Sequence, residues 1–176
     1  MERPPRLFLG VGNVLRRDDG VGSRAAQILA AWPLPDAVEV FDAGTLGLDA
    51  AVVLERRERV VVADAIDAAA DPGTIFRLAP EQLRPGCRSG LSVHDAHLLD
   101  ALDETHLLGT APERVVILAV QIGDVSTGIG LSPAVEASLE RVLRLAAHEL
   151  GIEAAPAVMP APRGDAADPR RSVPWL

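Results

Sequence analysis

The chain has 176 residues, 48% of them apolar, which is enough to bury one self-sufficient hydrophobic core, and we therefore expect a single domain. Its formal net charge of −8 argues against nucleic acid or an anionic membrane as a partner, because both attract clustered cations. The sequence contains no lysine, which excludes lysine-based Schiff-base and P-loop chemistry. The single Cys87 permits no internal disulfide, and no signal peptide or membrane-spanning run is predicted. We expect a cytoplasmic protein that acts as a monomer.

Short, continuous apolar runs alternate with helix-like patterns along the chain, which is typical of buried parallel strands. The predicted strands cover residues 6–11, 38–41, 59–63, 74–78 and 114–121. The fourth of them follows a tight turn at Asp71-Pro72-Gly73, and its short return connection predicts an antiparallel edge strand. We therefore predict a three-layer α/β/α fold with a five-stranded, mostly parallel sheet. Right-handed crossovers favour the strand order 2-1-3-5-4.

Helices are predicted between these strands from apolar residues at helical spacing. The first begins after Asp18, which we assign as its cap, and ends before Pro33. A short helical segment ends near Arg56, and another helix covers residues 96–102. The longest begins at Ser132-Pro133, with the serine as N-cap and the proline in the first helical position.

The C-terminal tail differs in composition from the rest of the chain. From residue 154 onward Ala, Pro, Gly, Asp and Arg replace the periodic apolar pattern. Such a segment buries too little apolar area to offset the entropy lost on ordering. We therefore predict one folded domain over residues 1–153 and a disordered tail over residues 154–176.

Polar residues able to do chemistry follow the ends of several predicted strands. They are Asp19, Asp42, Asp64 and His94. Ligands of parallel sheets bind just beyond the carboxyl ends of the strands, so these four side chains are expected at one edge. Asp64 is the strongest single candidate for a functional residue, because it ends a run of β-branched residues. A lone buried carboxylate is unfavourable, so Asp64 needs polar partners at the sheet edge. Carboxylates together with an imidazole are compatible with a metal site or a hydrolytic site.

Each of these residues also has an ordinary structural interpretation. Acids in a first helical turn complement the helix dipole, which is our preferred role for Asp18 and remains equally open for Asp19. His94 is as compatible with a solvated loop histidine as with a metal ligand. His97, three residues further on, is the nearest other histidine that could be the ligand. Cys87 has no clear base partner, which argues against a cysteine nucleophile.

The glycines after the first strand suggest a different enzyme class. Gly10-Val11-Gly12 matches part of a dinucleotide-binding fingerprint, but the third glycine position is occupied by Leu15. Two acids, Asp18 and Asp19, also lie where the phosphate charge would be. A nucleotide-dependent transferase or oxidoreductase that uses the loop from Gly10 to Asn13 is kept as an alternative.

Five motifs occur in order along residues 6–150. They are Gly10-Val11-Gly12-Asn13 with Asp18-Asp19-Gly20-Val21-Gly22, then Asp42-Ala43-Gly44-Thr45-Leu46-Gly47, Ala63-Asp64-Ala65, Ser92-Val93-His94, and Gly130-Leu131-Ser132-Pro133. Together they resemble one known family, the nickel-iron hydrogenase maturation endopeptidases, in which they occur in the same order. The set is specific as a whole, although each motif alone is weak. The resemblance does not cover the tail.

The resemblance implies removal of a short C-terminal extension from the hydrogenase large-subunit precursor after nickel insertion. It further implies that Asp19, Asp64 and His94 contact the metal, and that the nickel arrives with the precursor. Asp19 stands where many relatives carry Glu, which is one methylene longer. Asp42 is a second candidate for positioning or base catalysis. A chaperone that checks for nickel and binds the precursor without cutting it is the non-catalytic alternative.

Overall fold

The computed structural model describes residues 3–45, 50–83 and 93–153, with only the backbone described for residues 93–96. Its five strands are β1 (Arg6–Val11), β2 (Val38–Gly44), β3 (Arg59–Ile66), β4 (Ile75–Leu78) and β5 (Val115–Gln121). They form one sheet in the order β2-β1-β3-β5-β4. All neighbouring strands pair in parallel except β4, which runs antiparallel to β5 at the edge. The predicted strand order and mixed sheet are confirmed.

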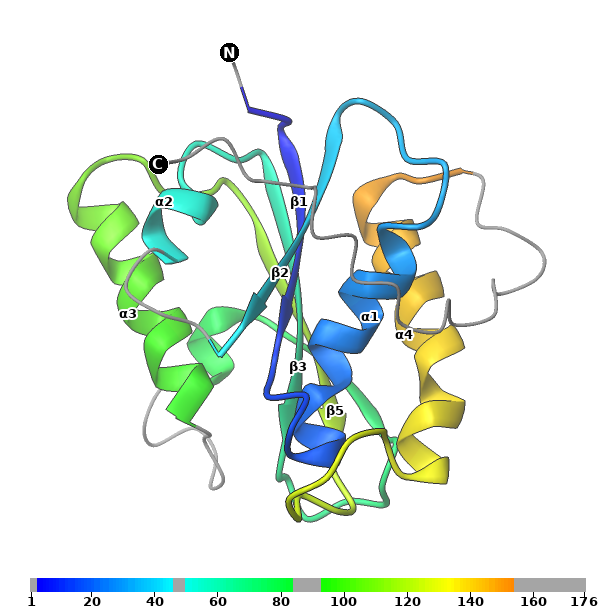
Figure 1. The fold of residues 1–176 in the computed structure, drawn as a ribbon. Helices are drawn as coiled ribbons and strands as arrows, with labels where there is room; N and C mark the ends of the chain where they lie inside the picture. The colour runs from blue at the N-terminus through cyan, green and yellow to red at the C-terminus, as the bar shows by residue number, and fades with distance from the viewer. Residues whose placement is uncertain (1–2, 46–49, 84–92, 154–176) are drawn as a thin grey trace, which may run out of the picture.

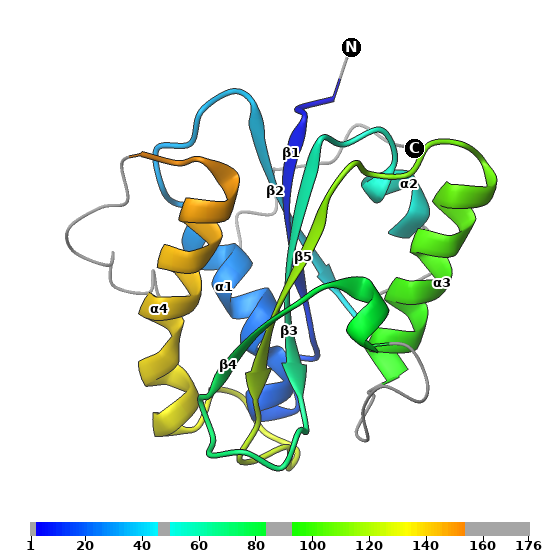
Figure 2. The same cartoon turned by 180° about the vertical axis from the view of Figure 1, so that it is seen from behind.

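Helices cover both faces of this sheet, as Figures 1 and 2 show. The helical segments are η1 (Arg17–Gly20), α1 (Val21–Leu29), α2 (Ala50–Leu54), η2 (Pro80–Leu83), α3 (Val93–Leu107) and α4 (Pro133–Leu150). Helices α1 and α4 lie on one face, and α2 and α3 lie on the other. The three predicted layers are therefore confirmed, with a hydrophobic core on each side of the sheet.

The alternation of side chains along β3 decides which face each residue serves. Its residues Val61, Ala63 and Ala65 are buried in the core beneath α1 and α4. Val60, Val62 and Ile66 are buried in the opposite core, beneath α2 and α3. Asp64 has the same parity as this second set. Its side chain therefore lies on the α2/α3 face of the sheet.

Two glycines let α1 pack unusually close to the sheet. A Cβ at Gly22, in the first turn of α1, would collide with the backbone oxygens of Ala63 and Val11. A Cβ at Gly10 would collide with the backbone oxygen of Gly22. Close helix–strand packing is the role that glycine plays in dinucleotide folds. Here Gly22 supplies this close packing, seven residues beyond Leu15, which occupies the third glycine position of the fingerprint.

Several elements extend further than the sequence patterns predicted. Strand β3 continues through Asp64 to Ile66, because β5 pairs with it up to the Ile66–Gln121 register position. Strand β2 likewise continues to Gly44, so Asp42 lies within the strand and not beyond its end, as the predicted strand over residues 38–41 implied. Helix α3 begins at Val93, three residues before the predicted start, which places His94 in its first turn.

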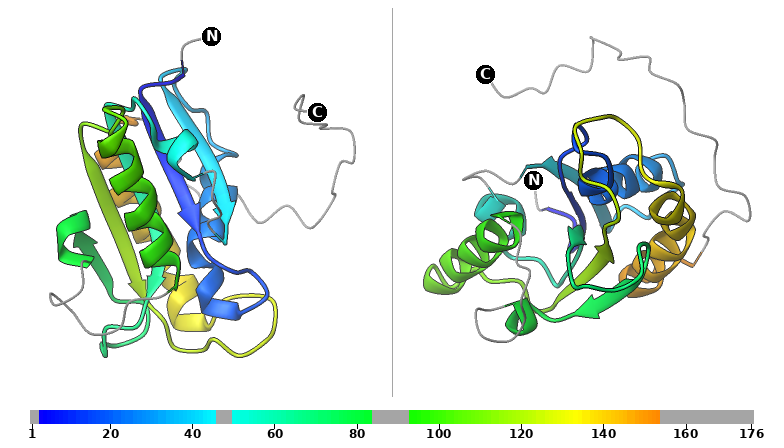
Figure 3. Two further views of the ribbon diagram at one scale, coloured as in Figure 1. Left: turned by 90° about the vertical axis from the view of Figure 1, so that its left-hand side faces the viewer. Right: turned by 90° about the horizontal axis from the view of Figure 1, so that it is seen from below.

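The carboxyl ends of β1, β3 and β5 meet at the lower edge of Figure 1, which Figure 3 shows from below. The segment η1 and the N-terminal ends of α3 and α4 lie at the same edge. We call this the carboxyl edge, and the opposite end of the sheet the amino edge. No helix within the described residues is long and apolar enough to cross a membrane. The tail at residues 154–176 and Cys87 lie outside the described residues.

Candidate active site

Asp19 lies in η1, which follows β1 after a connection over residues 12–16. Its backbone oxygen accepts a hydrogen bond of 3.1 Å from the Asn13 amide, and its own amide donates to Arg16 O at 3.1 Å. Gly12 has a φ of +145°, and a Cβ there would collide with the same Asp19 oxygen. The chain therefore needs glycine at position 12 to bring η1 back over the strand end. The returned segment packs against β3, the strand that carries Asp64.

Asp64 is buried near the carboxyl end of β3, with 1% of its surface exposed. One of its carboxylate oxygens accepts a hydrogen bond of 2.8 Å from the Ala65 amide. Burying a carboxylate is unfavourable unless polar partners compensate it, so such a residue inside a run of apolar residues indicates a specific role. The structure thus brings Asp19 and Asp64 to neighbouring elements of one edge.

His94 is the second residue of α3, whose first turn lies at the carboxyl edge. Helix α3 covers the face of the sheet from which Asp64 projects. The backbone of His94 is therefore at the same edge and on the same face as Asp64. Among the side chains that the structure describes, no three Asp, Glu, His or Cys residues are grouped as metal ligands. The imidazole of His94 is outside that description.

Asp42 occupies a different position from Asp64. It is exposed, and its two carboxylate oxygens accept hydrogen bonds from the Gly44 amide at 3.1 Å and from Gln27 Nε2 at 3.4 Å. Gln27 belongs to α1, so Asp42 lies on the α1/α4 face of the sheet. In register it is level with Gly10 of β1, two strands from β3. The structure therefore places Asp42 and Asp64 on opposite faces.

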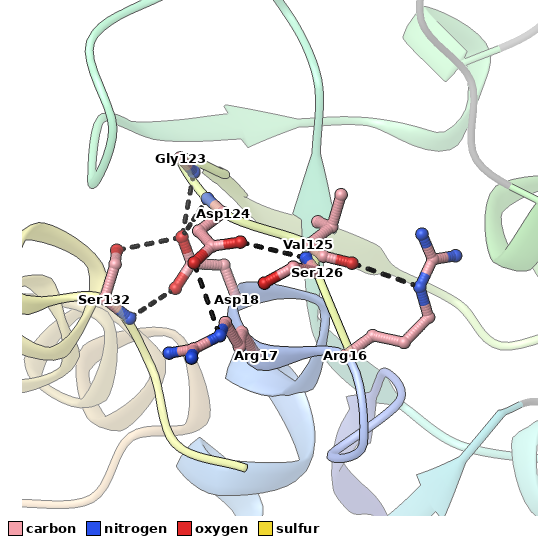
Figure 4. Close-up of polar contacts among 8 residues, drawn as sticks. All are labelled: Arg16, Arg17, Asp18, Gly123, Asp124, Val125, Ser126 and Ser132. Atoms are coloured by element: carbon pink, nitrogen blue, oxygen red, sulfur yellow. Dashed lines mark hydrogen bonds and ion pairs between the residues drawn. The ribbon is translucent and has the colours of Figure 1, made fainter. Parts of the chain in front are cut away.

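Asp18 does not cap α1, contrary to our assignment from the sequence. The N-cap position of α1 is held by Gly20, and no side chain bonds there. Asp18 is instead fully buried, and its carboxylate accepts four hydrogen bonds, which Figure 4 shows. The donors are the amides of Gly123 (2.8 Å), Asp124 (2.8 Å) and Ser132 (2.6 Å) and the Ser132 hydroxyl (2.8 Å).

These bonds determine the charge state of Asp18. Burial raises the pKa of the carboxyl group, but the bonds from Ser132, Asp124 and Gly123 outweigh it and hold the pKa below its usual value. Asp18 is therefore a stable anion at neutral pH. Ser132 occupies the N-cap position of α4 as predicted, but its side chain makes no capping bond. Its hydroxyl donates to Asp18 instead.

The β5–α4 loop, residues 122–132, is fastened to the segment around Asp18 by further bonds (Figure 4). Arg17 Nε lies 3.3 Å from Asp124 Oδ2, and Arg16 Nε donates to Val125 O at 3.3 Å. The backbone amide of Arg17 donates to Gly128 O, and the amide of Gly128 donates to Leu15 O. The loop and the turn before η1 therefore form one hydrogen-bonded unit.

A groove of about 500 Å³ lies beside this unit. Its lining includes Val14, Leu15 and Ile129, whose side chains are largely exposed, together with Arg17 and Arg24. Exposed apolar side chains beside a candidate active site are typical of surfaces that bind other proteins. The groove reaches η1 at Arg17 and Gly20, and neither Asp19 nor Asp64 is among the residues that line it.

The loop after β1 has already used the amides that a nucleotide phosphate would need. The amide of Gly12 donates to Gly44 O at 2.8 Å, and the amide of Asn13 donates to Asp19 O at 3.1 Å. The amide of Leu15 donates to the side chain of Asn13 at 3.0 Å. A phosphate site at a helix N-terminus depends on free amides, so this geometry does not support the nucleotide alternative.

Comparison with known proteins identifies the family. Residues 24–149, well over half of the chain, match the family model described as hydrogenase maturation protease. The chain belongs to the hydrogenase maturation protease family. It is 34% identical over 155 residues to the hydrogenase 2 maturation protease of Escherichia coli, covering 85% of this chain and 94% of that protein. It is 33% identical to the hydrogenase expression/formation protein HupD of Rhodobacter capsulatus, covering 86% of this chain and 75% of that one.

Solved structures of hydrogenase maturation proteases have the same fold. The maturating endopeptidase HybD of E. coli superimposes with a TM-score of 0.76 at 32% identity, covering 83% of this chain and 91% of that one. The [NiFe] hydrogenase maturation protease HybD of Thermococcus kodakarensis superimposes with a TM-score of 0.68 at 25% identity, covering 82% and 98%. The chain is a hydrogenase maturation endopeptidase, a peptidase, as the motifs predicted.

Sequence analysis missed the roles of two polar residues. The bond partners of Asp18 lie more than 100 positions away, so no local pattern indicates them. Gln121, at the end of β5, is buried, and its Oε1 accepts bonds from the Ala68 and Ala70 amides at 2.7 and 3.3 Å. It shapes the loop after β3. The sequence does single out Gln121 as a polar residue that ends a continuous apolar strand, but nothing in it indicates that Gln121 accepts hydrogen bonds from the loop after β3.

Proposed function

We propose that this maturation protease removes the C-terminal extension of a nickel-iron hydrogenase large-subunit precursor after nickel insertion. The observation that carries the proposal is the arrangement at the carboxyl edge. There η1 with Asp19 packs against β3 with Asp64, and α3 with His94 in its first turn covers the same face as Asp64. The names of the relatives support a hydrogenase as the protein acted on.

The donor set suits recognition of a metal that the substrate carries. Two carboxylates and an imidazole are accepted by nickel and by zinc, and three such ligands leave coordination positions open. In our proposal Asp19, Asp64 and His94 contact the nickel of the precursor, and the remaining ligands belong to the large subunit. Cleavage would then be coupled to correct metallation, because a precursor without nickel lacks the atom that these side chains recognise.

Peptide hydrolysis at this site has two routes. In the first, the substrate's metal polarises the scissile carbonyl or a water molecule. In the second, a carboxylate acts as general base on the attacking water. Asp19 and Asp64 are our first candidates for that base. Asp42 is kept as a second candidate, for base catalysis or for positioning substrate, and its exposed place on the α1 side means that it would act from that side.

The deciding experiment compares the same precursor with and without nickel. The purified protein is expected to shorten the nickel-loaded precursor, to leave the nickel-free precursor intact, and to ignore unrelated unfolded chains. The readout is the mass of the large subunit before and after incubation, with Asp64→Ala as the inactive control. Equal cleavage of both forms would contradict recognition of the metal. Tight binding of the precursor without any cleavage would favour the chaperone alternative.

A further inference from the structure

The segment that holds Asp19 has little internal support. It is a 3-10 helix of only four residues, and no side chain caps it. Hydrogen bonds in 3-10 geometry are weaker than those of an α-helix, so a short segment of this kind needs outside contacts to keep one conformation. The Asp19 backbone bonds to Asn13 and Arg16 within the same turn, while the segment as a whole packs against β3 and continues into α1. Its position relative to the sheet therefore depends on contacts outside the segment.

The residue before Asp19 supplies that outside contact. Asp18 is fully buried, its amide donates to Asp124 O at 3.1 Å, and its carboxylate receives the four bonds from Gly123, Asp124 and Ser132. Gly123 and Asp124 lie at the start of the β5–α4 loop, directly after β5, and Ser132 is the N-cap residue of α4 (Figure 4). One side chain thus bonds η1 to both ends of this loop.

We infer that Asp18 is a positioning residue that fixes the Asp19 carboxylate at the active site by anchoring η1 to the β5–α4 loop. This inference rests on the proposed function, because it requires Asp19 to act in the reaction. The two side chains are adjacent in the chain, so a shift of η1 that follows loss of the Asp18 bonds moves Asp19 with it. A displacement of about 1 Å at a reacting group lowers catalysis about 100-fold.

The competing interpretation gives Asp18 only a structural role. As a buried anion at the N-terminus of α4 it would stabilise that helix through its dipole and contribute nothing to the reaction. The two interpretations differ in one measurable respect. A purely structural residue changes the fraction of folded protein, whereas a positioning residue changes kcat of the molecules that remain folded.

The test uses Asp18→Asn, Ser132→Ala and Ser132→Thr in the full chain, with the nickel-loaded precursor as substrate. Asp18→Asn keeps the shape of the side chain but turns one acceptor into a donor that faces other donors. Ser132→Ala keeps the Asp18 carboxylate and removes only the hydrogen bond from the Ser132 hydroxyl. It therefore still tests the positioning role if Asp18→Asn fails to fold. Ser132→Thr retains the hydroxyl. Leu139→Ala, a buried apolar position in α4, is the control for lost stability.

Activity is measured at a temperature at which circular dichroism shows every variant folded. We expect Asp18→Asn to lower kcat about 10–100-fold with little change in KM, as for outer residues that orient metal-contacting groups. Ser132→Ala is expected to lower kcat by less, Ser132→Thr to restore it, and Leu139→Ala to keep the wild-type kcat. Wild-type kcat in both Asp18→Asn and Ser132→Ala would overturn the inference, as would an equal loss in Leu139→Ala.

Asp19→Ala in the same assay separates this inference from the proposed function. If Asp19→Ala is inactive while Asp18→Asn and Ser132→Ala keep the wild-type kcat, the positioning role is wrong and the proposed site survives. If Asp19→Ala keeps the wild-type kcat, the proposed site and the positioning role both fail. Asp18→Asn added to Asp19→Asn should bring no further loss, because residues that act through one another are not additive.

Discussion

The two edges of the sheet hold buried charge in different ways. At the amino edge, the guanidinium of Arg57 is almost fully buried and lies 2.7 Å from Glu39, an opposite charge. Glu149 is held there in the same manner, between Arg77 at 2.7 Å and Arg59 at 3.7 Å. At the carboxyl edge, the buried Asp18 carboxylate is satisfied by neutral amide and hydroxyl donors.

This difference separates stability from function. The ion pairs at the amino edge join residues that are far apart in the chain, Arg57 to Glu39 and Glu149 of α4 to Arg77 and Arg59, and the charges within each pair neutralise one another. Their removal should therefore reduce the free energy of unfolding and leave catalysis unchanged. Even the surface hollow of about 710 Å³ at that edge is lined by charged residues of both signs, among them Arg59 and Glu149. Carboxylates at the carboxyl edge are suited to a cation that the substrate brings. Changes there should affect activity first.

The largest effect of any substitution is expected on processing activity, from changes at the carboxyl edge. Asp64→Asn and His94→Ala should each lower processing of the nickel-loaded precursor by about 10³-fold or more, because each removes a contact to the reacting centre. Asp64→Asn keeps the shape of the buried side chain, so the thermal midpoint should stay near that of the wild type. Precursor mass and thermal unfolding are measured on the same preparations. A folded Asp64→Asn protein with full activity would remove Asp64 from the site.

Arg57→Met, at the amino edge, should lower stability and leave activity unchanged, the reverse of Asp64→Asn. It replaces a buried guanidinium that also donates to Val53 O at 3.1 Å, and it leaves the Glu39 carboxylate without its partner. We expect a loss of about 2–4 kcal/mol in the free energy of unfolding, measured by urea titration, since breaking a buried pair is strongly destabilising. The kcat of the folded fraction should be unchanged. A lower kcat in fully folded Arg57→Met would show that the amino edge also affects catalysis, and would contradict the proposed difference between the two edges.

A smaller effect is expected for Glu149→Gln, and it should depend on pH. The hydrogen bond from Arg77 holds the pKa of Glu149 below its usual value against the opposing effect of burial, with further help from the charges of Arg77, Arg114 and Arg59. A depressed folded-state pKa stabilises the protein above the unfolded-state value of 4.5, and this stabilisation is lost as the pH falls through the folded-state pKa.

The wild type should therefore exceed Glu149→Gln in stability by about 1 kcal/mol at pH 7, because Arg77 is half-exposed and solvent screens the pair. This difference should shrink as the pH is lowered below 4.5. Urea unfolding of both proteins between neutral and acidic pH provides the measurement. A difference that stays constant over the whole range would show that Glu149 contributes through packing and not through its charge.

The smallest effect is expected from deletion of residues 154–176. The sequence-based prediction of a disordered tail implies that the thermal midpoint stays nearly unchanged, since such a segment contributes little to the core. A large destabilisation would show that Val173, Trp175 or Leu176 packs on the domain. Reduced processing at unchanged stability would instead give the tail a role in binding the precursor.

The sequence by itself determined the architecture and the family. Continuous apolar runs predicted the three central strands, β1, β3 and β5, because a strand buried on both faces has few polar positions to interrupt it. The short connection after Asp71-Pro72-Gly73 predicted the antiparallel edge strand, and the handedness of crossovers predicted the strand order. The motifs around Asp19, Asp64 and His94 indicated the protease family, which the comparisons confirm. Their catalytic roles remain predictions.

Only the tertiary structure decided how the polar residues are divided among faces and partners. Strand parity combined with the packing of α1 places Asp42 opposite Asp64, and the pairing of β3 with β5 carries the sheet past Asp64. Asp18 belongs to the β5–α4 loop and not to its own helix, because its donors lie 105 to 114 residues away. Local patterns record propensity and periodicity, whereas a buried carboxylate binds whichever donors the fold brings to it.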